Sequence, residues 1–181
     1  MSRGSQPVEL VEYDPAWPEQ FAEERDRIAA ALGPAALVIE HIGSTAVLGM
    51  PAKPVIDIMV GVADIERSGQ AVAALIQLGY DYAPEFESDI PERRYFYKGI
   101  PDTHHVHMVE QTSDFFGQHL AFRDHLRSHP EAAAEYSRLK RGLAARFRND
   151  RDAYTEGKRS FVDTVVEAAL RSRAGDRNPP R

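Results

Sequence analysis

The sequence contains no cysteine. This absence excludes disulfide bonds, thiolate metal ligands and a cysteine nucleophile, and it is typical of a protein that works in a reducing compartment. An excess of basic residues is also missing, because 22 Lys+Arg stand against 28 Asp+Glu and give a formal net charge of -6. The chain as a whole therefore has no long-range attraction for nucleic acid or an anionic membrane, although a local basic pocket is compatible with this charge.

Long apolar runs and the common enzyme motifs are absent as well. The most apolar early segment, IAAALGPAALVI, follows the charged EERDR and is interrupted by Gly33-Pro34, so it fits neither a signal peptide nor a membrane span. No P-loop, G-x-G-x-x-G, H-E-x-x-H, G-x-S-x-G or kinase signature occurs. We therefore expect a cytoplasmic protein outside several large enzyme classes.

The composition and length of the chain favour one domain. Its 181 residues suffice for one well-packed core, and its 43% hydrophobic and 28% charged content is ordinary for a globular protein. Flexible tails are predicted for residues 1–6, MSRGSQ, and for residues 174–181, which combine Gly, Pro and charge without an apolar anchor. The predicted domain spans residues 7–170.

The periodicity of apolar residues predicts an α+β fold with a mixed β-sheet and flanking helices. Residues 103–110 and 93–99 form the strands of an expected antiparallel hairpin, and residues 35–42 and 54–62 form two further strands. Helices are expected over residues 18–32, over 65–78 with Asp64 as N-cap, and over 113–129, 130–147 and about 150–171. The carboxyl-terminal part is therefore expected to be helical.

Two neighbouring features carry possible chemistry. Gly43 allows close approach of a ligand to the backbone, and Ser44 and Thr45 add amide and hydroxyl donors for phosphate, although most Gly-Ser pairs are turns only. Asp57 lies within the apolar strand 54–62, where alternation places it on one face with Val55 and Met59. A carboxylate there is costly unless it meets a metal or another cation, and an ion pair with Lys53 is the structural alternative.

Histidines and basic residues extend this pattern. His105 and His107 are two apart in a strand, so their side chains share a face about 6.5–7 Å apart, a spacing suited to one metal or anion. Hydrogen-bonded histidines on a half-exposed strand are the alternative interpretation. Among the cations near the hairpin, Arg94 is one that could neutralise phosphate. Three cations of the helical half are interpreted as surface charges: Arg123, Lys140 and Lys158.

The segments that contain these residues resemble the GrpB family, uncharacterised proteins of the nucleotidyltransferase fold superfamily. The resemblance rests on EHIGSTAVLGMPAKPVIDIMV, VELVEYDPAWPEQFAEE, RRYFYKG, HHVHMVE and residues 122–161, and it covers about residues 7 to 170. It implies a mixed sheet and a Gly-Ser turn that holds a triphosphate. In nucleotidyltransferases a D-x-D or D-x-E pair on the next strand and a third acid bind two magnesium ions.

The sequence departs from that pattern at the acids. Asp57 matches the first acid and is the candidate catalytic residue, but Met59 stands at the second position, and His105 and His107 lie where a third acid is expected. Methionine cannot be a hard oxygen ligand for magnesium. One carboxylate with imidazoles instead favours zinc, manganese, iron or nickel, with His41 as a further ligand.

These observations lead to one hypothesis and two alternatives. The chain is expected to bind a nucleotide or other phosphorylated small molecule, with transfer of a nucleotidyl group left open by Met59. Phosphate is assigned to Gly43, Ser44, Thr45, Lys53 and Arg94, and a divalent metal to Asp57, His105 and His107. The alternatives are a non-catalytic nucleotide-binding or regulatory module and a metal-dependent hydrolase.

Overall fold

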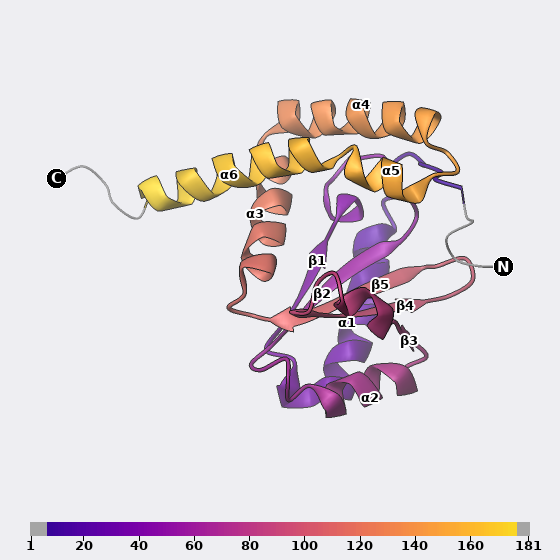
Figure 1. Ribbon diagram of the computed structural model, residues 1–181, viewed down its shortest axis with the longest axis vertical. Helices are drawn as coiled ribbons and strands as arrows, with labels where there is room; N and C mark the ends of the chain where they lie inside the picture. Colours follow the sequence, from indigo (N-terminus) through magenta and orange to yellow (C-terminus); the bar gives the residue numbers. More distant parts are fainter. Residues whose placement is uncertain (1–6, 177–181) are drawn as a thin grey trace.

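The computed structural model describes residues 7–176 and shows a five-stranded mixed sheet with helices against both faces (Figure 1). The predicted tail residues 1–6 and 177–181 lie outside the described residues. The strands are β1 (Val38–Ile42), β2 (Ile56–Val62), β3 (Asp81–Tyr82), β4 (Arg93–Lys98) and β5 (His104–Glu110). The α-helices are α1 (Trp17–Leu32), α2 (Gly69–Gln77), α3 (Asp114–Ser128), α4 (Pro130–Arg146), α5 (Arg151–Glu156) and α6 (Arg159–Asp176). The α+β class and the mixed sheet are confirmed.

The sheet has the order β1-β2-β5-β4-β3. Strand β2 pairs with β5 in parallel, and the other neighbours are antiparallel, including the expected β4–β5 hairpin. β2 and β5 are therefore the central strands. Their pairing brings two segments almost fifty residues apart in sequence into direct register.

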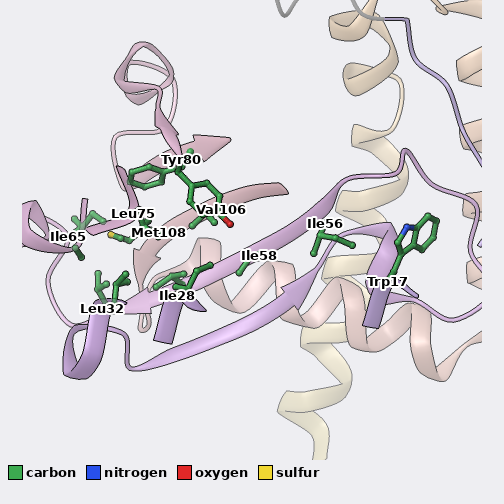
Figure 2. Packing of buried hydrophobic residues seen from close by; sticks show 14 of the residues in the cluster. Trp17, Ile28, Leu32, Ile56, Ile58, Ile65, Leu75, Tyr80, Val106 and Met108 are labelled. Carbon is green, nitrogen blue, oxygen red and sulfur yellow. The ribbon is translucent and has the colours of Figure 1, made fainter. Parts of the chain in front are cut away.

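One face of the sheet packs against α1 and α2. Every second residue of the central strands points there, including Ile56, Ile58, Val106 and Met108 (Figure 2). The helices contribute Ile28 and Leu75, among others, and both side chains are fully buried. This face is a continuous apolar core and explains why β2 is apolar at nearly every position.

The opposite face is divided between apolar packing and a polar site. Met59 is fully buried with Ile42, Val109 and Phe116, and α3 covers this end of the sheet. One step earlier along β2, the same face carries Asp57, whose side chain keeps 30% of its surface exposed. The expected burial of Asp57 inside the strand is thus incomplete, because the carboxylate faces a cavity.

The carboxyl-terminal helices form a layer beside that site. Ser113 caps α3 by accepting a hydrogen bond from Phe116 N, and Asp150 caps α5 by accepting one from Ala153 N, as the sequence pattern indicates. Two boundaries differ from the prediction. The last predicted helix is two helices, α5 and α6, and α6 continues past Arg171 to Asp176, into the predicted tail.

The α2 helix also begins later than expected. Asp64 accepts hydrogen bonds from Glu66 N and Arg67 N, so it caps a turn and not the helix, which begins at Gly69. The two-residue strand β3 was not predicted, because its length gives no detectable alternation. Within residues 7–176, no helix combines the length and the apolar character that crossing a membrane requires.

Candidate functional site

The sheet register assembles the centre of the site. Asp57 on β2 is the Cα partner of His105 on β5, which in turn pairs with Tyr97 on β4. On the other side, Asp57 pairs with Ile42, the last residue of β1 before the Gly43–Ser44 turn. Because Cβ atoms alternate, these neighbouring positions project on one face, and the carboxylate lies beside the turn.

Gly43 is required by this close approach. Its backbone has φ 70 and ψ −171, a region that is nearly restricted to glycine. A Cβ atom at this position would lie 2.5 Å from Asp57 Oδ2. The Gly-Ser pair and the aspartate are therefore one structural unit, in which the carboxylate packs directly against the turn.

His105 supplies the counter-charge of Asp57. Its Nδ1 lies 3.2 Å from Asp57 Oδ1, and its Nε2 lies 3.2 Å from Asp102 Oδ2. Burial opposes a charge on the ring, but the hydrogen bonds to Asp102 and Asp57 outweigh it and raise the pKa of His105. Burial would raise the pKa of Asp57, yet the hydrogen bond with His105 and the proximity of His107 hold it well below its usual range. His105 thus lies between two carboxylates, an arrangement that favours the protonated form of its ring.

His107 is in a different state. Burial lowers the pKa of His107 to about 4, so its ring is neutral near pH 7. Arg93 Nη1 lies 3.4 Å from His107 Nδ1, which must accept because the guanidinium only donates. The hydrogen of the neutral ring is therefore on Nε2, which lies 4.0 Å from Asp57 Oδ1.

Helices α3 and α4 hold the turn in place. Lys140, only 2% exposed, donates from Nζ to Ser44 Oγ over 2.7 Å and to Pro51 O over 2.5 Å. Arg127 donates to Ala46 O over 2.9 Å, and Arg123 donates to His41 O and Glu40. The surface role predicted for Lys140 and Arg123 is therefore wrong, since both side chains are buried and bind the backbone around the turn.

His41 does not join the site. It lies in register with Ile58 on the face of α1, where its ring stacks on Phe21 at a centroid distance of 4.6 Å. Its Nε2 is 3.0 Å from Thr45 Oγ1, whose hydroxyl also lies 3.5 Å from Val55 O. Thr45 lines the cavity described next, but its hydroxyl is occupied by these two partners. The expected metal-ligand role of His41 is not compatible with this placement.

A cavity of about 1450 Å³ opens over this face of the sheet. Its volume exceeds the roughly 300–1,000 Å³ that is common for small-molecule sites. Most of the predicted site residues line it: Gly43, Ser44, Thr45, Lys53, Asp57, His105 and His107. The turn and the Asp57–histidine face thus share one cavity.

Three of the four lysines in the sequence line this cavity, and we call Lys53, Lys140 and Lys158 the lysine cluster. They come from the loop before β2, from α4 and from the junction of α5 and α6. Burial and then the charge of Lys53 lower the pKa of Lys158 to about 8, and burial with Lys158 and Arg141 lowers the pKa of Lys140 to about 7. Within residues 7–176, none of the three forms an ion pair with a carboxylate.

Arg94 is not part of the cavity, which corrects the sequence-based assignment. It points to the opposite face of β4 and forms ion pairs with Glu66 and Glu87. The neighbouring Arg93 lines the cavity instead. Arg93 and Arg94 are adjacent in a strand, so their side chains point to opposite faces of the sheet. The sequence of this basic pair does not reveal which of the two arginines shares the face of His105.

The same geometry tests the metal hypothesis. Both ring nitrogens of His105 face carboxylate oxygens, and His107 Nδ1 faces a guanidinium, so neither imidazole offers a free lone pair to a metal shared with Asp57. In the part of the chain that the structure describes, no three His, Cys, Asp or Glu side chains are arranged to hold a metal ion. The arrangement does not fit a divalent metal at Asp57.

Fold and site together define an α+β protein with a mixed sheet, whose Asp–His pair faces a lysine-lined cavity. The chain matches the family described as GrpB protein over residues 7–168. It therefore belongs to the GrpB family.

Individual relatives agree with this assignment. The chain is 42% identical over 172 residues to the UPF0157 protein YqkA of Bacillus subtilis, which is 94% of this chain and 50% of that protein. It is 33% identical over 165 residues to the glutamate-rich protein GrpB of Alkalihalophilus pseudofirmus, covering 88% of this chain and 94% of that one. The crystal structure of the conserved protein GrpB from Enterococcus faecalis has a TM-score of 0.84 at 37% identity and covers 92% of this chain and 100% of its own. The chain thus spans only half the length of YqkA.

Proposed function

We propose that the cavity binds a nucleotide or another phosphorylated small molecule, with a phosphate held by the lysine cluster beside the Gly43–Ser44 turn. The observation that carries the proposal is the concentration of lysines in one cavity of a chain of net charge -6, none of them at ion-pair distance from a carboxylate of residues 7–176. Arg151 adds to it, because it also lines the cavity and its charge acts with burial to lower the pKa of Lys53. A phosphate would supply a direct counter-charge, where Asp57 and Asp102 act on these side chains only from beyond ion-pair distance.

The contacts of Lys140 and Ser44 support a phosphate at this position. Lys140 Nζ uses two hydrogens on Ser44 Oγ and Pro51 O, which leaves its third hydrogen for a ligand. The amine is fixed in position by these two acceptors, so little side-chain entropy is lost when an anion binds. Lys53 and Lys158 then complete a group of donors from three separate segments.

The proposal is for binding, and the arrangement of acids gives it no two-metal transfer mechanism. Met59 is fully buried in apolar packing and provides no oxygen ligand. Asp57 faces the cavity with His105 as its partner, so this pair can accept or donate a proton or hydrogen-bond a polar group of the ligand. The hydrolase alternative depends on a metal that the present hydrogen bonds do not accommodate.

Binding can be tested by calorimetry and thermal shift with pyrophosphate, ATP and a simple alkyl monophosphate. Lys53→Ala and Lys158→Met should each weaken binding about tenfold or more, since a charge-assisted contact contributes roughly 1.5–3 kcal/mol. Arg67→Gln is the control for net charge, because that side chain is 88% exposed and does not line the cavity. The proposal fails if no phosphorylated probe binds, or if the lysine variants bind as tightly as the Arg67 control.

A further inference from the structure

Arg93 has an environment that the site described so far does not explain. It lines the cavity from β4, with its guanidinium carbon 4.9 Å from the ring centroid of Tyr95 and 5.9 Å from that of Phe115 on α3. Two aromatic rings thus flank the cation and fix its plane. Stacking of this kind orients a guanidinium but leaves its N–H groups to find partners at the edge.

Those partners are largely missing. Arg93 Nη1 donates to His107 Nδ1, but Arg93 Nε is buried without any hydrogen-bond partner, the one such side-chain atom among the described residues. Within residues 7–176 no carboxylate lies at ion-pair distance from Arg93, and Asp89 acts on it only at longer range. A half-buried arginine without a counter-charge is costly, and because Nε itself is inaccessible, an anion that relieves it would have to reach the Nη–H groups from the cavity.

The backbone of Arg93 lies at the end of the β4–β5 pair that is far from the lysine cluster, and its guanidinium reaches back along the strand to His107. Asp57, His105 and Tyr97 form one row across the sheet, and Arg93 pairs with Val109 four residue pairs further on. Four residues of strand correspond to about 13 Å. The lysine cluster surrounds the turn that follows β1 and the loop that precedes β2, on the other side of the Asp57 row.

The middle of the cavity disfavours negative charge. Asp57 presents an ionised carboxylate there, and His107 is neutral. Tyr95 lies between Arg93 and the Asp57 row on the same face of the sheet, since it pairs with His107. A ligand that reaches both cationic ends must therefore pass this region with an uncharged segment.

We propose that Arg93 forms a second anion subsite, so that the ligand carries two acidic groups separated by an uncharged spacer, a phosphate in the lysine cluster and a carboxylate or second phosphate at Arg93. This inference rests on the proposed function for the first phosphate. It narrows the substrate class to elongated molecules with acids at both ends, and it excludes compact anions as complete ligands.

The test uses alkanediol bisphosphates, from ethanediol to dodecanediol, with the matching alkyl monophosphates and the phosphorylated ω-hydroxycarboxylic acids. Titration calorimetry gives the ratio of the affinity for each two-acid probe to that for its monophosphate. We expect the ratio to have a maximum at an intermediate length and to reach about tenfold or more, as expected for a bidentate charge-assisted pair. The carboxylate and bisphosphate arms show which acid Arg93 prefers.

Arg93→Met keeps the length and the apolar contact with Tyr95 and Phe115 but removes the fork, so the ratio should fall to about one. Arg93→Lys keeps the positive charge and should retain part of the affinity ratio. Arg94→Met is the matched control and should leave the ratio unchanged, because Arg94 points to the other face of the sheet. Circular dichroism checks the fold of each variant. The inference is overturned if monophosphates bind but a second acid adds nothing at any length, or if Arg93→Met keeps the full ratio. If no monophosphate binds, both this inference and the proposed function fall.

Discussion

Replacing Gly43 by alanine tests whether the turn and Asp57 form one unit. The new Cβ would meet Asp57 Oδ2 at 2.5 Å and the Cβ and Cγ atoms of the same side chain at 3.1 Å. It would also occupy a backbone conformation with φ 70 that costs roughly 1–2 kcal/mol for a residue with a side chain. Overpacking of a short, hydrogen-bonded side chain adds about 1–3 kcal/mol.

The expected loss for Gly43→Ala is therefore about 2–5 kcal/mol, which corresponds to a fall in Tm of roughly 4–20 °C for a chain of this size. Gly49→Ala separates the two contributions, because Gly49 has a similar φ of 74 and nothing within 4 Å of a Cβ atom. The Gly49→Ala control should lose only the contribution of the positive φ to the free energy of unfolding, about 1–2 kcal/mol. Chemical denaturation of both variants measures the difference.

A double-mutant cycle makes the result decisive. In an Asp57→Ala background the contacts with Oδ2 and Cγ are removed and only the Cβ contact at 3.1 Å remains, so Gly43→Ala should cost about 1–3 kcal/mol less than it does in the unchanged chain. If the two substitutions are additive, the carboxylate does not pack against the turn. The account of why a glycine precedes Ser44 would then be wrong.

Three further predictions concern the lysines, the metal and the opposite face. The pKa values of Lys140 and Lys158 are about 7 and 8, so both amines lose their positive charge as the pH rises. The affinity for a phosphate probe should therefore fall about tenfold or more per pH unit above pH 8. Calorimetry in buffers of different ionisation enthalpy measures this change. Equal affinity at pH 7 and pH 9 would contradict this assignment. The hydrogen bonds of His105 predict that EDTA leaves phosphate affinity unchanged and that Asp57→Asn retains as much zinc, manganese, nickel or magnesium as the unchanged chain, whereas a stoichiometric metal lost in that variant would restore the metal hypothesis. Glu24→Gln should lower the free energy of unfolding by about 3 kcal/mol without affecting phosphate affinity, because the buried carboxylate accepts from Tyr80 and Lys98 behind the sheet, and a hydrogen bond to a charged group contributes roughly 1.5–3 kcal/mol.

Alternation within strands explains how much of the site the sequence could reveal. A period of two places Asp57 on one face of its strand and His105 with His107 on one face of theirs, without any knowledge of which strands are neighbours. The order of strand, turn and strand favours one cleft for the Gly-Ser turn and Asp57, whereas their direct contact depends on the β1–β2 register. These features are local, and the structure places their side chains in one cavity.

Features that depend on packing between distant segments were not predictable in this way. Lys140 and Lys158 have the spacing of ordinary surface charges on helices, and only the packing of α4 and the α5–α6 junction against the turn turns them toward the cavity. Whether Arg93 or Arg94 faces the cavity depends on the pairing register of β4 with β5, which the composition of the hairpin does not determine. Asp102, the second partner of His105, lies in a connecting loop that shows no periodicity.

The separate origins of Lys53, Lys140 and Lys158 have a consequence for local opening. Without an anion their like charges repel one another across the seam between the loop before β2 and helices α4 to α6, and this repulsion lowers the free energy needed to separate the two sides. A phosphate bound among them reverses the sign of the interaction and joins the two sides. Ligand binding should then slow amide hydrogen exchange in α5 and the start of α6 and leave the exchange in α1 and α2 unchanged. A bound anion would in this way stabilise the packing of the carboxyl-terminal helices against the loop before β2.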